Sequence, residues 1–302
     1  MQMGRKSLSR TTEGMLLLLP FMVGITVFKI WPLIRVLFVS FAEGYNYLTA
    51  EYDAINLANY RKIFEDYLFQ QAIRNTVIYA AVVVPSVIVI SLMVAWCLLR
   101  AKRGLAFFQA LIFLPFITSD IAIGMAWRIV FSNHGVLNSI LDAVGAGTVG
   151  WLSDMRVSLW TLIIYGIWSG IPLTVLIFYT SMLNIDQNLL TAARVGGAGE
   201  MRIFLHIVLP MFRPVVTMAF AVNSISAWMT FSGLFPLFAG QPGPYYNLYT
   251  LTYYIYDKSR QGRYGFAYAC AAACVQLVLV LLFLMLRYVL VPLLQRRKGG
   301  RV

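Results

Sequence analysis

Long apolar runs separated by short polar segments dominate the chain. A helix needs roughly 20 apolar residues to cross the hydrocarbon core of a membrane. Six runs reach that length, at about 15–40, 73–99, 105–131, 157–182, 208–238 and 264–292. Backbone groups inside lipid must be paired within one segment or in a closed barrel, and these runs lack the alternation of barrel strands. The pattern predicts an all-α membrane protein with six transmembrane helices in a single domain, 1–302.

Composition agrees with a lipid environment, because 60% of the residues are apolar and only 12% are charged. Charged residues make up about a quarter of ordinary soluble domains. The first apolar run follows basic residues and is much longer than the roughly 7–15 residues of a signal peptide. We expect an uncleaved first span, although Ser40-Phe41-Ala42 also fits a small-x-small cleavage site.

The net charge of +12 is distributed by membrane side. Twelve Lys and Arg residues fall in segments 1–13, 100–104, 184–206 and 293–302. The intervening polar segments hold six, together with eight of the twelve acidic residues, in 41–72, 132–156 and 239–263. The positive-inside rule predicts that the first set, with both termini, is cytoplasmic. This distribution favours a membrane protein over one that binds nucleic acid.

The chain offers little for chemistry of its own. Cys97, Cys270 and Cys274 fall within predicted spans, where they favour packing over a disulfide framework or a metal site. We find no nucleophile, metal cluster or acid-base pair, so we expect no catalytic residue, no metal and no enzyme activity in this chain.

A glycine-broken segment between the fourth and fifth spans is the most informative motif. It reads Thr191-Ala-Ala-Arg-Val-Gly-Gly197, followed after nine residues by Ile207-Val-Leu-Pro210. Asp186 is placed to cap a helix that runs to about Val195. The glycines are placed to stop that helix, because glycine adopts positive φ without steric cost. The segment resembles the coupling loop, here about 186–206, of binding-protein-dependent ABC importer permeases.

Further motifs are similar to those of the carbohydrate-importing members of that family. They occur in order as Asn56-Leu-Ala-Asn59-Tyr60, Arg74-Asn75-Thr76, Phe113-Leu-Pro115, Gly135-Val-Leu-Asn138 and Gly265-Phe-Ala-Tyr-Ala269. The resemblance covers roughly residues 15–290, and its specificity lies in the ordered series.

The resemblance implies that the coupling loop docks on a separate nucleotide-binding subunit. The residues it places there are Thr191, Ala192, Ala193, Arg194, Gly196, Gly197 and Glu200. Thr191 replaces the family's acidic residue and Gly196 its usual Asp, so neither position carries the family's charge. The chain has no phosphate-binding loop, so ATP and Mg²⁺ are expected in partner subunits and no cofactor in this one.

Polar residues inside the spans are candidates for a substrate pathway. Asp120 is acidic and mid-span, so it should face protein or water; the alternatives are an ion pair with Arg128 or a packing role. Asn223, Ser226 and Thr230 are spaced along one helical face, with interhelical hydrogen bonding as the alternative. The remaining candidates are Ser119, Tyr165, Trp168, Ser169 and Trp228, the last as a stacking surface for a sugar ring.

The sequence thus predicts a permease subunit of a carbohydrate ABC importer in the plasma (inner) membrane of a bacterium or archaeon. Its implied partners are a second homologous permease, two ATPase subunits, an extracytoplasmic solute-binding protein, a sugar substrate and membrane lipids. A different solute, such as a glycerol phosphate, and an ion-coupled secondary transporter are the alternatives. Asp120 favours a neutral, hydroxyl-rich solute.

Overall fold

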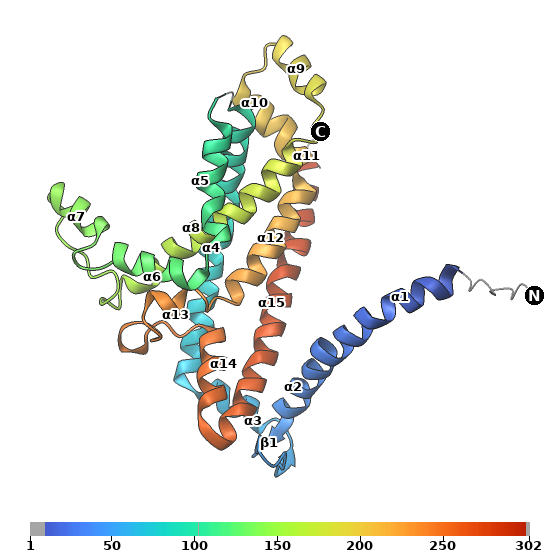
Figure 1. Ribbon diagram of the computed structural model, residues 1–302, viewed down its shortest axis with the longest axis vertical. Coiled ribbons are helices and arrows are strands. Elements are labelled where there is room, and N and C mark those ends of the chain that lie inside the picture. Colours follow the sequence, from blue (N-terminus) through green and yellow to red (C-terminus); the bar gives the residue numbers. More distant parts are fainter. Residues whose placement is uncertain (1–9, 102, 300–302) are drawn as a thin grey trace, which may run out of the picture. The chain divides into compact units, whose positions relative to one another are not determined.

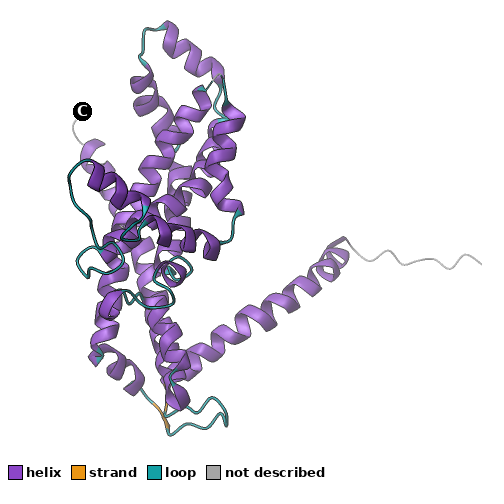
Figure 2. Cartoon of the chain, turned by 60° about the vertical axis from the view of Figure 1, so that its left-hand side comes forward, coloured by secondary structure: helices purple, strands orange, loops and turns teal. Residues whose placement is uncertain are grey.

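The computed structural model describes residues 10–101 and 103–299. The chain divides into two compact units. The first contains the described residues up to Phe64 together with Ile255–Val275, and the second contains Glu65–Tyr254 together with the chain from Gln276 onward. Both are helical, and the only strands among the described residues form one short pair (Figure 2).

The first unit begins with a long apolar helical stretch. It consists of α1 (Arg10–Ile25), a π-helical turn η1 (Thr26–Ile30) and α2 (Trp31–Phe41). Gly14–Phe41 is long and apolar enough to cross a membrane, and none of its most apolar window is buried. The faces of this stretch are therefore free to contact lipid or another protein.

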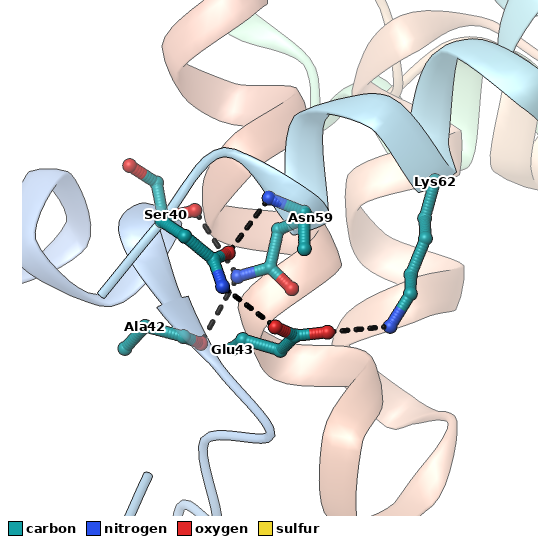
Figure 3. A network of polar contacts seen from close by, with 7 residues as sticks. Ser40, Ala42, Glu43, Asn59 and Lys62 are labelled. Atoms are coloured by element: carbon teal, nitrogen blue, oxygen red, sulfur yellow. Dashed lines mark hydrogen bonds and ion pairs between the residues drawn. The ribbon is translucent and has the colours of Figure 1, made fainter. Parts of the chain in front are cut away.

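A polar network follows directly where this stretch ends. Strands β1 (Ala42–Glu43) and β2 (Ala54–Ile55) pair antiparallel and lead into α3 (Ala58–Glu65). The buried Asn59 amide donates to the carbonyls of Ser40 at 3.1 Å and Ala42 at 3.0 Å (Figure 3). Asn59 belongs to the Asn-Leu-Ala-Asn-Tyr motif, so this part of the motif fixes the chain's exit from the first span.

Glu43 links the same strand to α3. Its carboxylate accepts from Asn56 Nδ2 at 2.7 Å and from Lys62 Nζ at 3.1 Å (Figure 3). The hydrogen bond from Asn56, together with that from Lys62, lowers the pKa of Glu43, because both favour the charged carboxylate. Beside this network, Cys270 packs in an apolar cluster with Val39 and Tyr45, in the packing role predicted for it.

Two long helices form the centre of the second unit. They are α4 (Tyr67–Arg100) and α8 (Ser158–Met182), which pack along each other (Figure 1). Asp66 caps α4 by accepting from the Leu68 N–H at 2.9 Å. Both helices agree with predicted spans, 73–99 and 157–182.

Glycines on α8 allow α4 to approach closely. A Cβ added at Gly166 would overlap the buried Tyr79 side chain, and one at Gly170 would lie 2.9 Å from a methyl carbon of Val87. One turn further on, Thr174 donates to the Gly170 carbonyl at 2.9 Å. Small residues on one helix face are the usual means of helix packing in membranes, where no hydrophobic effect drives association.

The predicted span 105–131 is not one helix. It forms α5 (Leu105–Ile117) and α6 (Asp120–Val130), which meet at 106°. Pro115 lies in the last turn of α5, where its ring and missing N–H disrupt the helix. Thr118 and Ser119 are extended, so the chain turns before α6 begins.

The predicted span 208–238 is also broken. Its first part begins earlier, with α10 (Glu200–Ile203), a π-helical turn η2 (Phe204–Val208) and α11 (Leu209–Met211). Its second part, α12 (Arg213–Trp228), is bent by 72° from the first, and Pro214 lies in its first turn. The chain then leaves the helix and forms α13 (Leu234–Leu237).

Over the described residues, four helices are long and apolar enough to cross a membrane, and the count is six if each bent pair is one span. The last of the four is Tyr264–Met285 within α15 (Gly262–Gly299), in agreement with the predicted span 264–292. Shorter elements connect the spans: α7 (Val136–Ala143), α9 (Gln187–Val195), η3 (Pro244–Tyr246) and α14 (Leu251–Arg260). Several of these connections are held by buried asparagines.

Asn138 and Asn75 account for two further sequence motifs. Asn138 Oδ1 accepts from the Val149 N–H and from Trp151 Nε1, both at 3.0 Å, which closes the loop after α7. Asn75 Nδ2 donates to the carbonyls of Asn247 at 2.8 Å and Tyr249 at 3.0 Å. The motifs around these asparagines therefore have a structural role, because each asparagine side chain forms hydrogen bonds with backbone groups of a loop.

The close approach at Gly166 gives a test of the packing of α4 against α8. Gly166→Ala forces Tyr79 to move, so we expect the unfolding free energy to fall by about 1–3 kcal/mol, as is typical of overpacking. The measurement is the thermal unfolding midpoint of the detergent-purified protein. Gly24→Ala is the matched control, since no atom lies within 4 Å of its added Cβ. Equal midpoints for the two variants would contradict the packing argument.

Candidate functional site

The segment after α8 folds as the sequence predicts. Asp186 caps α9 by accepting from the Asn188 N–H at 2.9 Å, and α9 ends at Val195. Gly197 has φ +79°, in the left-handed region, whereas Gly196 has φ −72°. Gly197 is thus the residue that requires glycine.

Two backbone hydrogen bonds close the end of α9. The Gly197 N–H donates to the Arg194 carbonyl and the Ala198 N–H to the Ala193 carbonyl, both at 3.0 Å. This pair is a Schellman motif, which satisfies carbonyls that a helix end leaves free. The turn lets α9 fold back into α10 within a few residues, and α9 projects at one end of the unit (Figure 1).

One face of α9 is buried and the other is open. Leu190 is 1% exposed, while Val195 on the same helix is 84% exposed. The open positions also include Thr191, Ala192, Arg194, Gly196 and Gly197, and Ala193 is half-buried. The short side chains at 192 and 193 leave a surface that another protein can approach closely.

Glu200 ties the turn after α9 to α4. Arg194 Nε donates to Glu200 Oε1 at 2.9 Å, and Arg100 Nε lies 3.6 Å from Oε2. The second contact is an ion pair too long for a hydrogen bond, and Oε2 is buried without a hydrogen-bond partner in the described chain. We call Arg100, Arg194 and Glu200 the charged clasp.

Aromatic packing supports the charged clasp from below. Trp96 on α4 and Phe204 on η2 are both 8% exposed or less, with ring centroids 5.4 Å apart. The Arg100 guanidinium lies 5.9 Å from the centroid of Trp96, a geometry in which the cation is attracted to the ring face. The sequence did not single out Arg100, because it lies a hundred residues from Glu200.

A second group of candidate residues meets between α6 and α8. The Tyr165 hydroxyl lies within electrostatic range of both Ser169 and Asp120. Asp120 is the first residue of α6 and is exposed, as is Ser169. Ser119, in the break before α6, is also exposed. Because of the break, the Asp120 carboxylate lies at the start of a helix and not in the middle of one.

Two tryptophans border this group. Trp127 packs edge-on against Trp168 with centroids 5.1 Å apart, and its ring lies 6.3 Å from that of Tyr165. Trp127 follows Asp120 by seven residues, or about two helical turns, so the two share a face of α6. The sequence already contains this spacing, although Trp127 was not among the predicted pathway residues. We call Asp120, Trp127, Tyr165, Trp168 and Ser169 the α6–α8 site.

The alternative pairing of Asp120 with Arg128 does not fit this geometry. The two residues are eight positions apart on α6, about 12 Å along the axis. Arg128 is exposed and lines two cavities of about 520 and 260 Å³. No ion pair joins it to Asp120 in the described structure.

The polar residues of the fifth span do not form one stripe. Asn223 Nδ2 donates to Thr174 Oγ1 at 2.9 Å, which is a contact between α12 and α8. Ser226 is exposed. Since α12 ends at Trp228, Thr230 lies beyond the helix, where its carbonyl accepts from Thr250 Oγ1 at 3.1 Å. Asn223 thus takes part in the interhelical bonding given above as the alternative.

Trp228 is enclosed by the chain. Its side chain is 2% exposed and its ring packs edge-on against Phe283, with centroids 5.8 Å apart. Its carbonyl accepts from the buried Gln276 amide at 2.8 Å. In this structure Trp228 therefore packs between helices and does not present its ring at the surface.

Within the described residues, no group of three His, Cys, Asp or Glu side chains could hold a metal ion.

The apolar broken and unbroken spans, with a capped helix projecting beyond them, define a multi-pass membrane permease. The chain belongs to the family of binding-protein-dependent transport system inner membrane components, whose model matches residues 68–298.

Known relatives agree with this assignment. The chain is 34% identical to the probable ABC transporter permease protein YesP of Bacillus subtilis, over 86% of this chain and 84% of YesP. It is 29% identical to the lactose transport system permease protein LacF of Rhizobium radiobacter, over 94% and 96%. The fold is similar to a chain of a bacterial alginate ABC transporter solved in complex with an alginate pentasaccharide-bound periplasmic protein, with a TM-score of 0.76, 22% identity and coverage of 93% and 94%.

The charged clasp gives a prediction for the mobility of α9. In Glu200→Gln we expect amide hydrogens of α9 and the following turn to exchange roughly two- to fivefold faster, the range for a partly exposed ion pair. Hydrogen exchange with mass spectrometry, at one pH for all samples, measures this. Asp142→Asn, a carboxylate exposed elsewhere, is the control. Unchanged exchange in the Glu200 variant would mean that the clasp does not hold α9.

Proposed function

We propose that this chain is the permease subunit of an ATP-driven carbohydrate importer and forms half of its translocation pathway. Family membership favours ATP-driven import over an ion-coupled transporter. The names of the relatives, a lactose permease and a transporter for the polysaccharide alginate, support a carbohydrate as the solute. The single observation that carries the proposal is the exposed α9, closed by Gly197 and joined to α4 by the charged clasp.

The proposed role of α9 is to seat in a cleft of a separate ATPase subunit. ATP and Mg²⁺ belong to that subunit, which supplies the hydrolysis. When two such subunits close, a force on α9 passes through Glu200 to Arg100 at the end of the 34-residue α4. The charged clasp thus connects the cleft of the ATPase subunit, through α9, to a helix long enough to span the membrane.

The proposed solute site is the α6–α8 site. A carboxylate accepts two or more hydrogen bonds from hydroxyls, and the exposed Asp120 carries one. Asp120 and the exposed Ser169 both lie within electrostatic range of the Tyr165 hydroxyl. Aromatic rings offer apolar faces for a sugar ring, and Trp127 and Trp168 stand next to these groups. This combination suits a neutral, hydroxyl-rich solute.

The proposed assembly adds a second homologous permease, two ATPase subunits and an extracytoplasmic solute-binding protein. The periplasmic protein bound to the similar alginate transporter supports the last of these. The charge distribution along the chain favours cytoplasmic termini and places α9 on the cytoplasmic side. The location is the plasma (inner) membrane of a bacterium or archaeon.

Replacing Gly197 tests the coupling role. Gly197→Leu places a side chain in the left-handed region, where L-residues are disfavoured, although no atom lies within 4 Å of the added Cβ. We expect ATP hydrolysis to continue while solute uptake falls at least tenfold, because the turn no longer positions α9. Uptake and ATPase activity are measured together in proteoliposomes containing the full complex.

Gly199→Leu is the matched control for this experiment. Gly199 also has open space around it, but its φ of −68° suits any residue. The Gly199→Leu variant adds the same side chain two residues away and should retain coupling. If both variants transport at the wild-type rate, the backbone of this turn is not required for coupling.

A second experiment tests the solute site. Sugars are screened, each with the solute-binding protein, for stimulation of the complex's ATPase, and the best is used to compare Asp120→Asn with Asp142→Asn. Loss of a charged acceptor costs about 1.5–3 kcal/mol, so we expect Asp120→Asn to lower uptake about tenfold or more. A complex without ATPase activity, or stimulation only by non-carbohydrate solutes, would overturn the proposed function.

A further inference from the structure

An apolar groove lies between α4 and α5 of the second unit. Its volume is about 540 Å³, within the roughly 300–1,000 Å³ typical of ligand sites. Every lining side chain is apolar or a thiol; they include Met93, Val94, Cys97, Leu98, Phe108 and Ile112. The groove is open to the surface, since Met93 is 57% exposed. Such a surface suits an extended hydrocarbon chain.

A basic residue follows the groove along the chain. Helices α4 and α5 are joined by the connector 101–104, which contains Arg103. Ala101 lines the groove, and Arg103 follows two residues later. Arg103 is exposed and takes part in no ion pair of the described structure. An apolar groove with an exposed arginine two residues beyond its lining is complementary to an anionic amphiphile.

Arg100 is not free to fill this role. It is paired with Glu200 at 3.6 Å and lies over the Trp96 ring. The same pairing shows that the connector and the segment after α9 lie at one end of the second unit. On the proposed function that end is cytoplasmic, where the leaflet carries anionic lipid headgroups that attract basic residues.

We propose that the groove binds an anionic phospholipid of the inner leaflet, with one acyl chain between α4 and α5 and the phosphate at Arg103. The site rests on the proposed function only for its membrane side. The bound headgroup stands three residues from Arg100, and thus beside the charged clasp that holds α9. The lipid site would link membrane composition to α9, the helix proposed to dock on the ATPase subunit.

Photocrosslinking to lipid tests this. The full complex is reconstituted in phosphatidylcholine vesicles that contain phosphatidylglycerol with a photoactivatable group on its acyl chain. Parallel vesicles carry the same group on phosphatidylcholine. We expect adducts on peptides containing Met93, Cys97 and Phe108, with about fivefold more from phosphatidylglycerol, the contribution of one basic residue at an anionic surface. Mass spectrometry locates and counts the adducts.

Three variants separate the parts of the site. Arg103→Gln should abolish the preference for phosphatidylglycerol and leave phosphatidylcholine adducts unchanged. Cys97→Phe, which fills the groove, should lower adducts from both lipids. Arg156→Gln removes an exposed arginine outside the site and should change neither.

The outcomes are distinct from those of the transport experiments, because adducts form whether or not the complex hydrolyses ATP. Equal labelling by both lipids in the wild-type protein would mean ordinary annular contact and would overturn the proposal. So would absence of lipid adducts from the groove peptides, the result expected if a second permease covers the groove.

Discussion

The need to pair every backbone polar group in lipid governs this structure. Helices meet that need within a single segment, and proline is the residue that interrupts them. A proline lies at each of the two bends: Pro115 precedes the 106° turn into α6, and Pro214 opens α12 after the 72° bend. Proline alone does not decide the bend, since Pro85 and Pro172 lie inside the unbroken α4 and α8. Asp120 stands at the first of these breaks. The interruptions thus create places where polar side chains can be presented inside an apolar bundle.

The contacts that hold the second unit together also border its candidate solute site. Gly166 lets the buried Tyr79 side chain approach α8. Tyr165, which directly precedes Gly166, lies within electrostatic range of Ser169 and Asp120. Because packing residues and site residues alternate along α8, a shift of α4 against α8 would alter the proposed site directly. Rigid packing and solute access are therefore properties of one helix pair.

The charged clasp joins local and distant parts of the chain. Arg194 lies in α9, six residues from Glu200, whereas Arg100 ends α4, a hundred residues and two spans earlier in the chain. Exposed ion pairs stabilise weakly on their own, so the clasp depends on the buried Trp96 and Phe204 rings beneath it. A weak polar contact on a firm apolar base suits the coupling role proposed for α9. The clasp also brings the end of α4, and the connector that follows it, to the turn after α9.

The sequence by itself determined the features that depend on neighbouring residues: the four unbroken helical spans, the Asp186 cap, the end of α9 at Val195 and the stop at its glycines. These follow from periodicity, capping and the conformational freedom of glycine, all of which act over a few residues. The tertiary structure decided the 106° turn before Asp120, the meeting of Trp127 with Trp168, the burial of Trp228 and the pairing of Arg100 with Glu200. Each of these depends on which helix faces which across the bundle, and that arrangement is set by packing between segments far apart in the chain.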